Sequence, residues 1–591
     1  MTVHVVATAG HVDHGKSTLV RAITGTDPDR LQEERRRGLT IDLGFASTTL
    51  PSGRELSFVD VPGHVRFLKN MLAGVGSVDA CLFVVAATEG WKPQSEEHLR
   101  ILDLLGLRRG LVALTHADRV DDDTLRRRMT EVMRRAAGSF LAGAPVTAVD
   151  GLHGGGVAEL VSTLDGLLAT APTAPDRGRP RLWIDRAFHV AGAGAVVTGS
   201  LGGGALHRGD ELIATPADGR DATLRVRALQ THGRAVEHAT PGRRLAVNVT
   251  GVPLDHLHRG QALIRRDQWE PTCRFDAELT VLPALDGPVT RVGAFRLHVG
   301  SGQHHARLRL LGATSLEPGA TGPVRIHVPR PLPLLPGDRF VLRDVGRATT
   351  VGGGEVLDVA PVVPAAHARP DRSVDRVVRE RGWVDAGLLE RLTGEQRTAT
   401  VGRWVVDPVA LADAVRAVRT LVAQAGAAGL DLARLGERQR AVLPMDPDVH
   451  VANGRAWSGD VEAVRLEDHP FLRRLDDDAF SPPDPRAAGV EATDLRELVR
   501  RGLVVECGGI WFGAVAVQRA AAVVAGLLAE HPEGVSVSDV RAALGTSRRF
   551  ALPLLVHFDT HGVTRRRGDL RVAGPRLTDV AASGPLEVLS S

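Results

Sequence analysis

The chain has 591 residues, of which 43% are hydrophobic and 24% charged, and its formal net charge is only +3. This length exceeds what one hydrophobic core supports, so three or more domains are expected. No apolar run is long enough to span a bilayer, and the small net charge does not by itself require a nucleic-acid partner. We expect a cytoplasmic protein that engages no membrane.

Residues 3–170 alternate short apolar runs with helical segments. The apolar runs read VHVVAT, LSFVDVP, CLFVVAA, GLVALTHAD and APVTAVD. Alternation of this kind is typical of a mainly parallel sheet covered by helices. The sequence therefore predicts an α/β domain over 1–172, followed by a linker rich in proline and polar residues.

The first apolar run leads into AGHVDHGKST, which carries the spacing G-x-x-x-x-G-K-S. In such a loop the glycines let backbone N–H groups curl around phosphates, and the following helix points its positive end at them. Lys16 is expected to reach the β- and γ-phosphates, and Ser17 to bind Mg²⁺. The pattern predicts a P-loop nucleotide site.

Further motifs follow in the order that such a site needs. Asp60 in DVPGH can hold Mg²⁺ through water, and the N–H of Gly63 can meet the γ-phosphate. Thr40, in the loop between, is a second hydroxyl ligand for Mg²⁺. Asp118, at the end of LTHAD, can accept two hydrogen bonds from a guanine edge. The predicted metal ligands are Ser17, Thr40 and Asp60; the predicted nucleotide contacts are His11, Val12, Asp13, His14, Gly15, Lys16, Ser17, Thr18, Gly63, Thr115, His116, Asp118, Thr147 and Ala148.

These motifs together resemble the GTP-binding domain of translational GTPases such as elongation factor Tu. The resemblance implies GTP and Mg²⁺ as cofactors and a monovalent cation at Asp13. It also implies an apolar gate of Val12 with Leu39, and a catalytic His64 that positions the attacking water.

One position departs from the family. The guanine motif Asn/Thr-Lys-x-Asp is Thr-His-Ala-Asp here, so His116 stands where a lysine stem normally packs over the base. An imidazole can stack there instead. Guanine selectivity is then expected to rest mainly on Asp118.

The pattern changes after the linker. Short β-branched runs separated by Gly, Pro and Asp turns predict two antiparallel β-barrels, over 178–267 and 268–362. After a second linker the chain repeats short helices followed by a hairpin. This rhythm predicts tandem winged-helix modules (α+β) over 370–591, the last at about 515–575.

Two segments beyond the first domain resemble the selenocysteine-specific elongation factor (SelB) family. They are RLWIDRAFHVAGAGAVVTGSL, at 181–201, and SRRFALPLLVHFDTHGVTRRRGDLRV, at 547–572. The resemblance implies a pocket for the aminoacyl group made by Arg186 and Arg244, with Asp185 as their orienter. A selenol is largely anionic at neutral pH, so fixed positive charge would favour it over a neutral serine hydroxyl.

The C-terminal end is rich in arginine. Six arginines fall within 541–568 against one acid, Asp559. In a winged helix, 547–559 would be the recognition helix, with Leu552, Leu555 and Val556 facing the core. Pro553 requires that helix to kink or to start later. The predicted RNA contacts are Arg541, Arg548, Arg549, Arg565, Arg566 and Arg567.

The sequence thus predicts a GTPase elongation factor with ribosome-stimulated hydrolysis. Its expected partners are selenocysteyl-tRNA, an mRNA hairpin bound by the last winged helix, and the ribosome, and a monomer is expected. Two alternatives stay open: a general translation factor, and a regulatory GTPase subunit of a metabolic enzyme such as sulfate adenylyltransferase. The arginine-rich tail argues against the second alternative.

Overall fold

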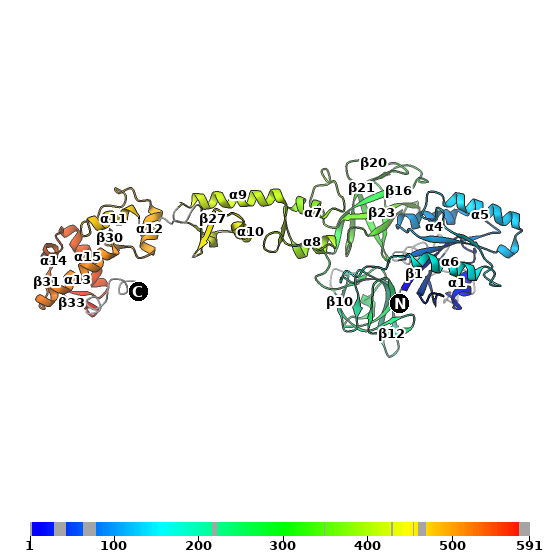
Figure 1. The fold of residues 1–591 in the computed structure, drawn as a ribbon, viewed down its shortest axis with the longest axis horizontal. Helices are drawn as coiled ribbons and strands as arrows, with labels where there is room; N and C mark the ends of the chain where they lie inside the picture. Colours follow the sequence, from blue (N-terminus) through cyan, green and yellow to red (C-terminus); the bar gives the residue numbers. More distant parts are fainter. Residues whose placement is uncertain are drawn as a thin grey trace. The chain divides into compact units, whose positions relative to one another are not determined.

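The computed structural model describes residues 3–28, 43–62, 78–215, 222–347, 349–426, 429–452, 454–458 and 469–577. The chain divides into two compact units, 1–407 and 408–591, and each is considered by itself. Figure 1 gives the order of elements along the chain. Among the described helices, none is long and apolar enough to cross a bilayer.

The first unit begins with a six-stranded sheet in the order β2-β3-β1-β4-β5-β6. All neighbouring strands are parallel except β2, which runs antiparallel to β3. The strands are β1 (Val3–Gly10), β2 (Gly44–Thr49), β3 (Glu55–Asp60), β4 (Ala80–Ala86), β5 (Gly110–Thr115) and β6 (Val146–Ala148). The central strands are apolar and buried on both faces, because helices cover each side.

In the described part of this domain, helices cover both faces of the sheet (Figure 1). One apolar cluster joins the sheet to α4 (Pro93–Leu104) and α5 (Asp122–Ala136), and the other joins it to α1 (Lys16–Thr24) and α6 (Val157–Ala169). Because the sheet is mainly parallel, the motifs that end β1, β3, β5 and β6 meet at its carboxyl edge.

The second domain is an antiparallel barrel in the order β10-β15-β7-β8-β14-β11, closed by pairing of β10 with β11. The strands are β7 (Arg181–Val190), β8 (Gly194–Gly202), β9 (Leu206–His207), β10 (Glu211–Ala214), β11 (Ala222–Thr231), β12 (Arg234–Val236), β13 (His238–Ala239), β14 (Arg243–Thr250) and β15 (Ala262–Ile264). Its alternating inward residues form one aliphatic core.

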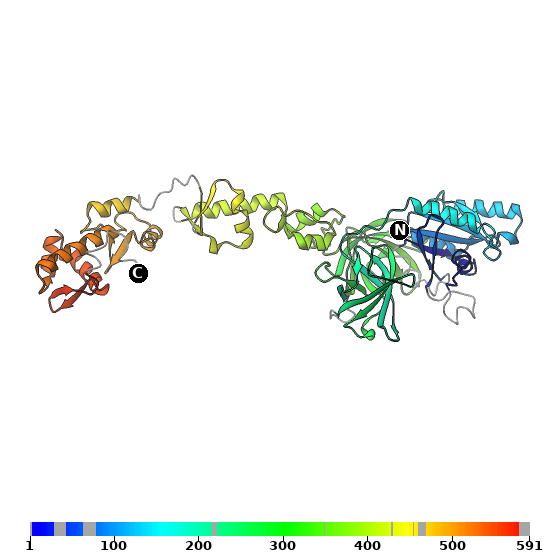
Figure 2. The same cartoon turned by 60° about the horizontal axis from the view of Figure 1, so that its bottom comes forward.

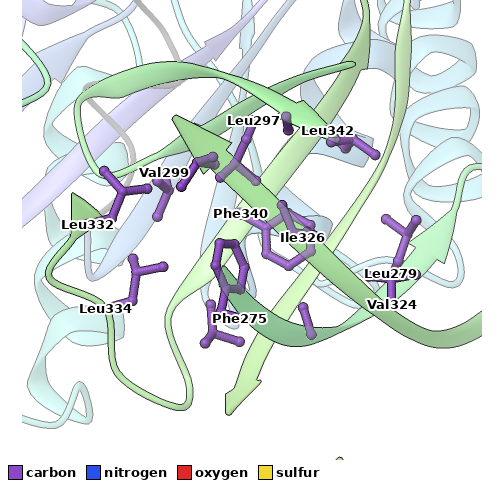
Figure 3. Packing of buried hydrophobic residues seen from close by; sticks show 14 of the residues in the cluster. Phe275, Leu279, Leu297, Val299, Val324, Ile326, Leu332, Leu334, Phe340 and Leu342 are labelled. Carbon is purple, nitrogen blue, oxygen red and sulfur yellow. The ribbon is translucent and has the colours of Figure 1, made fainter. Parts of the chain in front are cut away.

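The third domain is a closed barrel in the order β16-β21-β19-β18-β22-β23. Its strands are β16 (Thr272–Val281), β18 (Phe295–Val299), β19 (Gly302–Leu310), β21 (Thr321–Leu332), β22 (Arg339–Asp344) and β23 (Thr350–Asp358), with the short pair β17 (Val289–Thr290) and β20 (Ser315–Leu316). Phe275, Ile326 and Phe340 meet at the centre of its core (Figure 3). Figure 2 shows the strands of the two barrels from a second direction.

A small module, residues 374–407, ends the first unit. It contains α7 (Val374–Arg381), β24 (Trp383–Asp385), α8 (Ala386–Thr393) and β25 (Trp404–Val406). Arg376 of α7 is 3% exposed and pairs with Asp358 of β23 at 3.0 Å, so the module is tied to the second barrel. Arg179, in the linker before the first barrel, donates to the carbonyl of Glu390 at 2.6 Å.

The second unit repeats helices and short hairpins. It contains α9 (Pro408–Gln424), β26 (Leu430–Asp431), α10 (Glu437–Val442), β27 (Val449–Ala452), β28 (Arg455–Ser458), α11 (Pro470–Asp477), α12 (Ala492–Arg500), β29 (Val504–Cys507) and β30 (Ile510–Gly513). The last module is α13 (Ala514–Glu530), β31 (Val535–Ser536), α14 (Val537–Ala543), α15 (Arg548–Thr560), β32 (Thr564–Arg567) and β33 (Leu570–Ala573). Its helices share one apolar core with β29 and β30.

Candidate functional site

The phosphate loop, residues 10–17, owes its path to two glycines. Gly10 has φ +133°, and a Cβ added there would lie 2.1 Å from the carbonyl oxygen of Val84, so no other residue fits. Gly15 takes the left-handed conformation (φ +81°) immediately before α1 begins at Lys16. The loop therefore ends at a helix N-terminus, where backbone N–H groups are available to an anion.

Lys16 is 6% exposed, and its ammonium lies inside the loop. Nζ donates to the carbonyls of His11 at 2.6 Å and Gly10 at 3.2 Å. These bonds hold the charge beside the backbone that a phosphate would approach.

The metal-ligand residues predicted on β3 and α1 meet. Ser17 Oγ donates to Asp60 Oδ2 at 2.7 Å, and Thr8 Oγ1 donates to Asp60 Oδ1 at 2.5 Å. Asp60 is fully buried, and the N–H of Val61 donates to Thr8 Oγ1. A hydroxyl and a carboxylate at this spot are hard oxygen donors, which are the ligands that Mg²⁺ prefers.

The guanine motif at the end of β5 is fastened to the phosphate loop. Thr115 Oγ1 donates to the carbonyl of His14 at 2.8 Å, so this side chain joins two loops. His116 has φ +55°, and a Cβ added to Gly15 would lie 3.5 Å from its Nε2. The imidazole thus lies beside the phosphate loop, where it can flank a base.

Asp118 is exposed at this edge, in a short turn. The carboxylates of Asp118 and Asp150 and the ring of His153 form a cluster. One ligand atom from each lies within 4.8 Å of the other two. His153 Nδ1 is 2.6 Å from Asp150 Oδ2. Sequence reasoning did not single out Asp150 or His153, because nothing but the loop after β6 brings them to β5. Thr147 is buried in β6, beside β5.

The other loop residues differ in exposure. Asp13 is exposed and has φ +62°, Thr18 is exposed, and His11 and Val12 are half-buried. His14 is fully buried, and burial lowers the pKa of its ring to about 4. Four predicted residues, Leu39, Thr40, Gly63 and His64, lie outside the described residues.

The arginines predicted to face the cargo lie where the first barrel meets β2. Arg244 of β14 donates to both carboxylate oxygens of Asp185, at 2.8 and 2.9 Å, and Thr198 donates to the same carboxylate at 2.6 Å. The guanidinium of Arg244 lies 3.5 Å from the centre of the Phe45 ring, and that of Arg186 lies 5.0 Å from it. Phe45 was missed because its role depends on contact between domains, and Thr198 because its role depends on strand pairing within the barrel.

Arg186 completes this junction from β7. Its guanidinium donates to the carbonyl of Leu43, the residue just before β2. Both arginines therefore sit at a seam between the α/β domain and the first barrel. Asp185 offsets the charge of Arg244, and the three side chains together carry one net positive charge.

A cleft of about 520 Å³ in the last module collects part of the arginine cluster. Arg541 comes from α14, Arg548 from the start of α15 and Arg566 from the hairpin β32–β33. The cleft is also lined by Ser536, Val537, Ser538, Leu552, Asp569 and Arg571. Arg549, Arg565 and Arg567 are exposed nearby but do not line it.

Asp559 does not face this cleft as a free acid. It accepts from Thr564 Oγ1 at 2.6 Å and from Nε of the buried Arg571 at 3.3 Å. The single acid within 541–568 is therefore engaged inside the fold. The sequence did not single out Arg571. It lies opposite Arg566 in the β32–β33 hairpin, so its place beside the cleft follows from strand register.

Three family models match this chain. They describe the elongation factor Tu GTP-binding domain, over residues 1–170, the beta-barrel domain of selenocysteine-specific elongation factor, over 276–362, and the winged helix of elongation factor SelB, over 526–573. Similarity also extends over nearly whole relatives. Elongation factor Tu 2 of Streptomyces avermitilis is 31% identical over 380 residues, which are 60% of this chain and 96% of that relative. The chain belongs to the translational GTPase family.

Within this family, the predicted resemblance to selenocysteine-specific elongation factors is confirmed. Those of Desulfomicrobium baculatum and Escherichia coli K12 are 43% and 38% identical, over 60% and 66% of this chain. The chain spans 55% and 64% of the lengths of these two relatives.

A solved bacterial selenocysteine-specific elongation factor has the same fold. Its TM-score is 0.69 at 24% identity, covering 97% of this translational GTPase and all of that chain. The predicted fold class is confirmed: an α/β P-loop GTPase domain, two antiparallel barrels and winged-helix modules.

Helix α15 of this GTPase corrects one prediction. Its core-facing residues are Ala551, Leu554, Leu555 and Phe558, whereas Leu552 is 37% and Val556 50% exposed. The apolar stripe therefore follows the 3–4 spacing from Ala551, and only Leu555 was placed correctly. The helix begins at Arg548 and continues through Pro553, so it does not start later.

Proposed function

We propose that this translational GTPase binds and hydrolyses GTP with Mg²⁺ and delivers selenocysteyl-tRNA to the ribosome. An mRNA hairpin held by the last winged helix would recruit it there. The observation that carries this is that one chain combines a phosphate loop joined to a guanine motif, in its first unit, with an arginine-lined cleft in its second unit. A regulatory subunit of a metabolic enzyme would have no use for that cleft. Such a factor would work in the cytoplasm, and we propose a monomer.

The nucleotide site divides the work among residues of the α/β domain. Loop N–H groups and Lys16 would hold the phosphates, and Asp118 would read the guanine edge. Ser17, Asp60 and Thr40 would hold Mg²⁺, which would offset charge that develops on the transferring phosphoryl oxygens. The remaining predicted contacts, a monovalent cation at Asp13 and water positioning by His64, belong to this proposal.

The cargo pocket rests on the seam between the α/β domain and the first barrel. Asp185 and Phe45 orient Arg244, and the guanidinium of Arg186 lies near the same ring. An anionic selenolate would gain a charge-assisted contact that a serine hydroxyl would not. Since Arg186 also bonds the residue that precedes β2, changes in the nucleotide site can reach this pocket.

We propose four domains for this function: a GTP-binding domain, two barrels and a winged-helix region, with limits 1–172, 178–267, 268–362 and 370–591. The second candidate function is that of a general translation factor, because translation factors with other names are similar to this chain over nearly their whole length. Translation initiation factor 2 subunit gamma of Thermococcus kodakarensis is 30% identical over 97% of its length.

The deciding experiment separates the two units. A chain ending at Asp407, the boundary between them, should bind GTP in the presence of Mg²⁺. It should lose the affinity of the full chain for hairpin RNA, measured against a panel of hairpins and random RNA. If the full chain binds no hairpin above random RNA, hairpin recruitment is wrong and the general translation factor is favoured.

The guanine assignment has its own test. Wild type should discriminate strongly against ATP, and Asp118→Asn should lose preference for guanine, because one of the two acceptor oxygens is replaced by an NH2 group that only donates. Equal binding of ATP and GTP by wild type would leave only a P-loop.

For the cargo, Arg186→Ala and Arg244→Ala should each weaken selenocysteyl-tRNA more than seryl-tRNA. The loss should be roughly 1.5–3 kcal/mol for selenocysteyl-tRNA, measured by protection of the aminoacyl ester. Equal losses for both tRNAs would mean that the arginines only hold the common acceptor end.

A further inference from the structure

Two side chains of helix α4, which belong to none of the predicted motifs, contact the phosphate loop. Gln94 and His98 are four residues apart, so they lie on one face of the helix. The N–H of Gly10 donates to His98 Nδ1 at 3.1 Å, and the N–H of Val12 donates to Gln94 Oε1 at 3.2 Å. Both bonds cross more than 80 residues of sequence, so only the tertiary fold creates them.

The bond to His98 fixes the state of its ring. The side chain is 1% exposed, and Nδ1 can accept a hydrogen bond only when the imidazole is neutral with its proton on Nε2. Burial, helped by the nearby charge of Lys16, lowers the pKa of His98 to about 3. The acceptor is therefore present throughout the physiological pH range.

The two bonds act on the part of the loop that Lys16 also grips. α4 takes the N–H groups of Gly10 and Val12, while the ammonium takes the carbonyls of Gly10 and His11. Backbone polar groups on successive residues are thus fixed from two sides. The N–H groups that would face phosphate, from Asp13 onward, continue directly from this fixed segment.

Other residues of α4 contact the second barrel. Thr350 of β23 donates to Glu97 at 3.3 Å, and a Cβ added to Gly353 would lie 3.0 Å from Leu104. Val341 of β22 belongs to the same apolar cluster as Leu99 and Ile101. The helix cannot drift away from the loop without breaking these contacts, so it is a rigid support.

We propose that His98 and Gln94 are positioning residues for the bound nucleotide. They hold the phosphate loop in its binding shape from outside the site, and their loss shortens the residence time of GDP and GTP. The inference rests on the proposed nucleotide binding and adds the residues that preorganise it. Preorganisation lowers the ordering cost of binding, and its loss shows mainly in the dissociation rate.

The test measures dissociation of fluorescent GDP and GTP from the full chain by stopped flow. His98→Ala leaves the buried N–H of Gly10 without its acceptor, so dissociation should be about 10- to 100-fold faster. His98→Asn returns an acceptor oxygen close to the place of Nδ1 and should recover most of the wild-type rate. Gln94→Ala should act in the same direction but less strongly, because its bond is only partly buried.

Leu99→Ala is the matched control for damage to the helix. It is fully buried next to His98 but faces the apolar cluster, so it should lower the melting temperature and leave dissociation near the wild-type rate.

The inference is overturned if Leu99→Ala speeds dissociation as much as His98→Ala, or if His98→Asn behaves like His98→Ala. Wild type that binds neither nucleotide would overturn the proposed function as well. Wild type that binds both, with His98→Ala unchanged, would overturn the inference alone.

Discussion

The phosphate loop and the arginine-lined cleft are both suited to phosphate, but the groups that would contact the phosphate differ. In the loop, one buried lysine is tied to backbone carbonyls, and the binding groups are backbone N–H groups shaped by glycine. In the cleft, exposed arginine side chains from three elements converge. The loop depends on backbone shape, and the cleft depends on charge.

This difference predicts opposite sensitivities. A loop defined by its backbone should respond sharply to small steric changes and weakly to salt, because its partners are short-range and buried. A surface defined by side-chain charge should tolerate substitution in the fold but lose affinity steeply as salt rises. Four experiments test this contrast between the loop and the cleft, beginning with the substitution of Gly10.

Gly10→Ala should abolish nucleotide binding and destabilise the α/β domain by several kcal/mol. Its Cβ would lie 2.1 Å from a backbone oxygen, and φ +133° is strained for alanine. Gly53→Ala is the control, with positive φ (+83°) but nothing within 4 Å of the added Cβ. It should cost about 1 kcal/mol and leave binding unchanged. Thermal unfolding and nucleotide titration measure both, and equal effects would contradict the steric argument.

Replacing Arg548 and Arg566 together by glutamine should weaken hairpin binding about 10- to 100-fold at physiological salt. If each arginine contacts one phosphate, the log–log salt slope should fall by about 0.7–0.9 per residue. Arg496→Gln, an exposed arginine of α12 outside the cleft, is the control and should change neither. GTP affinity followed over the same salt range should change much less; a matching salt slope would remove the contrast between the regions.

Acid should weaken the α/β domain more than the last module. Burial lowers the pKa values of His14 and His98 to about 4 and 3, and that of the half-buried His557 to about 4. Unfolded histidine takes up its proton near pH 6.5, so the stability is complete above that pH and is lost as pH falls below it.

The size of this loss follows from proton linkage. Each of the two histidines in the α/β domain should remove about 1.4 kcal/mol per pH unit below pH 6.5, and His557 less because water reaches it. Hydrogen exchange of β1 and α4 amides against α15 amides, at pH 7.5 and 5.5, measures the difference. A larger loss in α15 would contradict the assignment.

Leu552→Ala should have the smallest effect on stability, within about 0.5 kcal/mol, because this side chain is 37% exposed at the cleft. Leu555→Ala, three residues on and fully buried, should cost about 2–5 kcal/mol. Chemical denaturation of the two variants separates a residue of the binding surface from one of the core. A large loss for Leu552→Ala would restore the core-facing role that the sequence suggested.

The architecture predicted from the sequence is confirmed, and the kind of each site stays a prediction. The alternation of strands and helices, the G-x-x-x-x-G-K-S spacing and the motifs at strand ends are local patterns, and parallel strands must bring their ends to one edge. Arg244 and Asp185 could be paired from the family resemblance. The arginine excess at 541–568 was visible in composition, and so was the change from α/β to barrels to winged helices.

The residues that support these sites could be identified only from the packing of the fold. The contacts of Phe45 with two arginines, and those of His98 and Gln94 with the phosphate loop, join elements far apart in the chain. The pairing of Asp559 with Arg571 depends on how the last hairpin packs against α15. The face of α15 was misjudged because leucine and valine occur on both sides of the helix, and burial depends on what packs against each side. Periodicity names the apolar residues of a helix, but the neighbouring elements choose which of them lose contact with water.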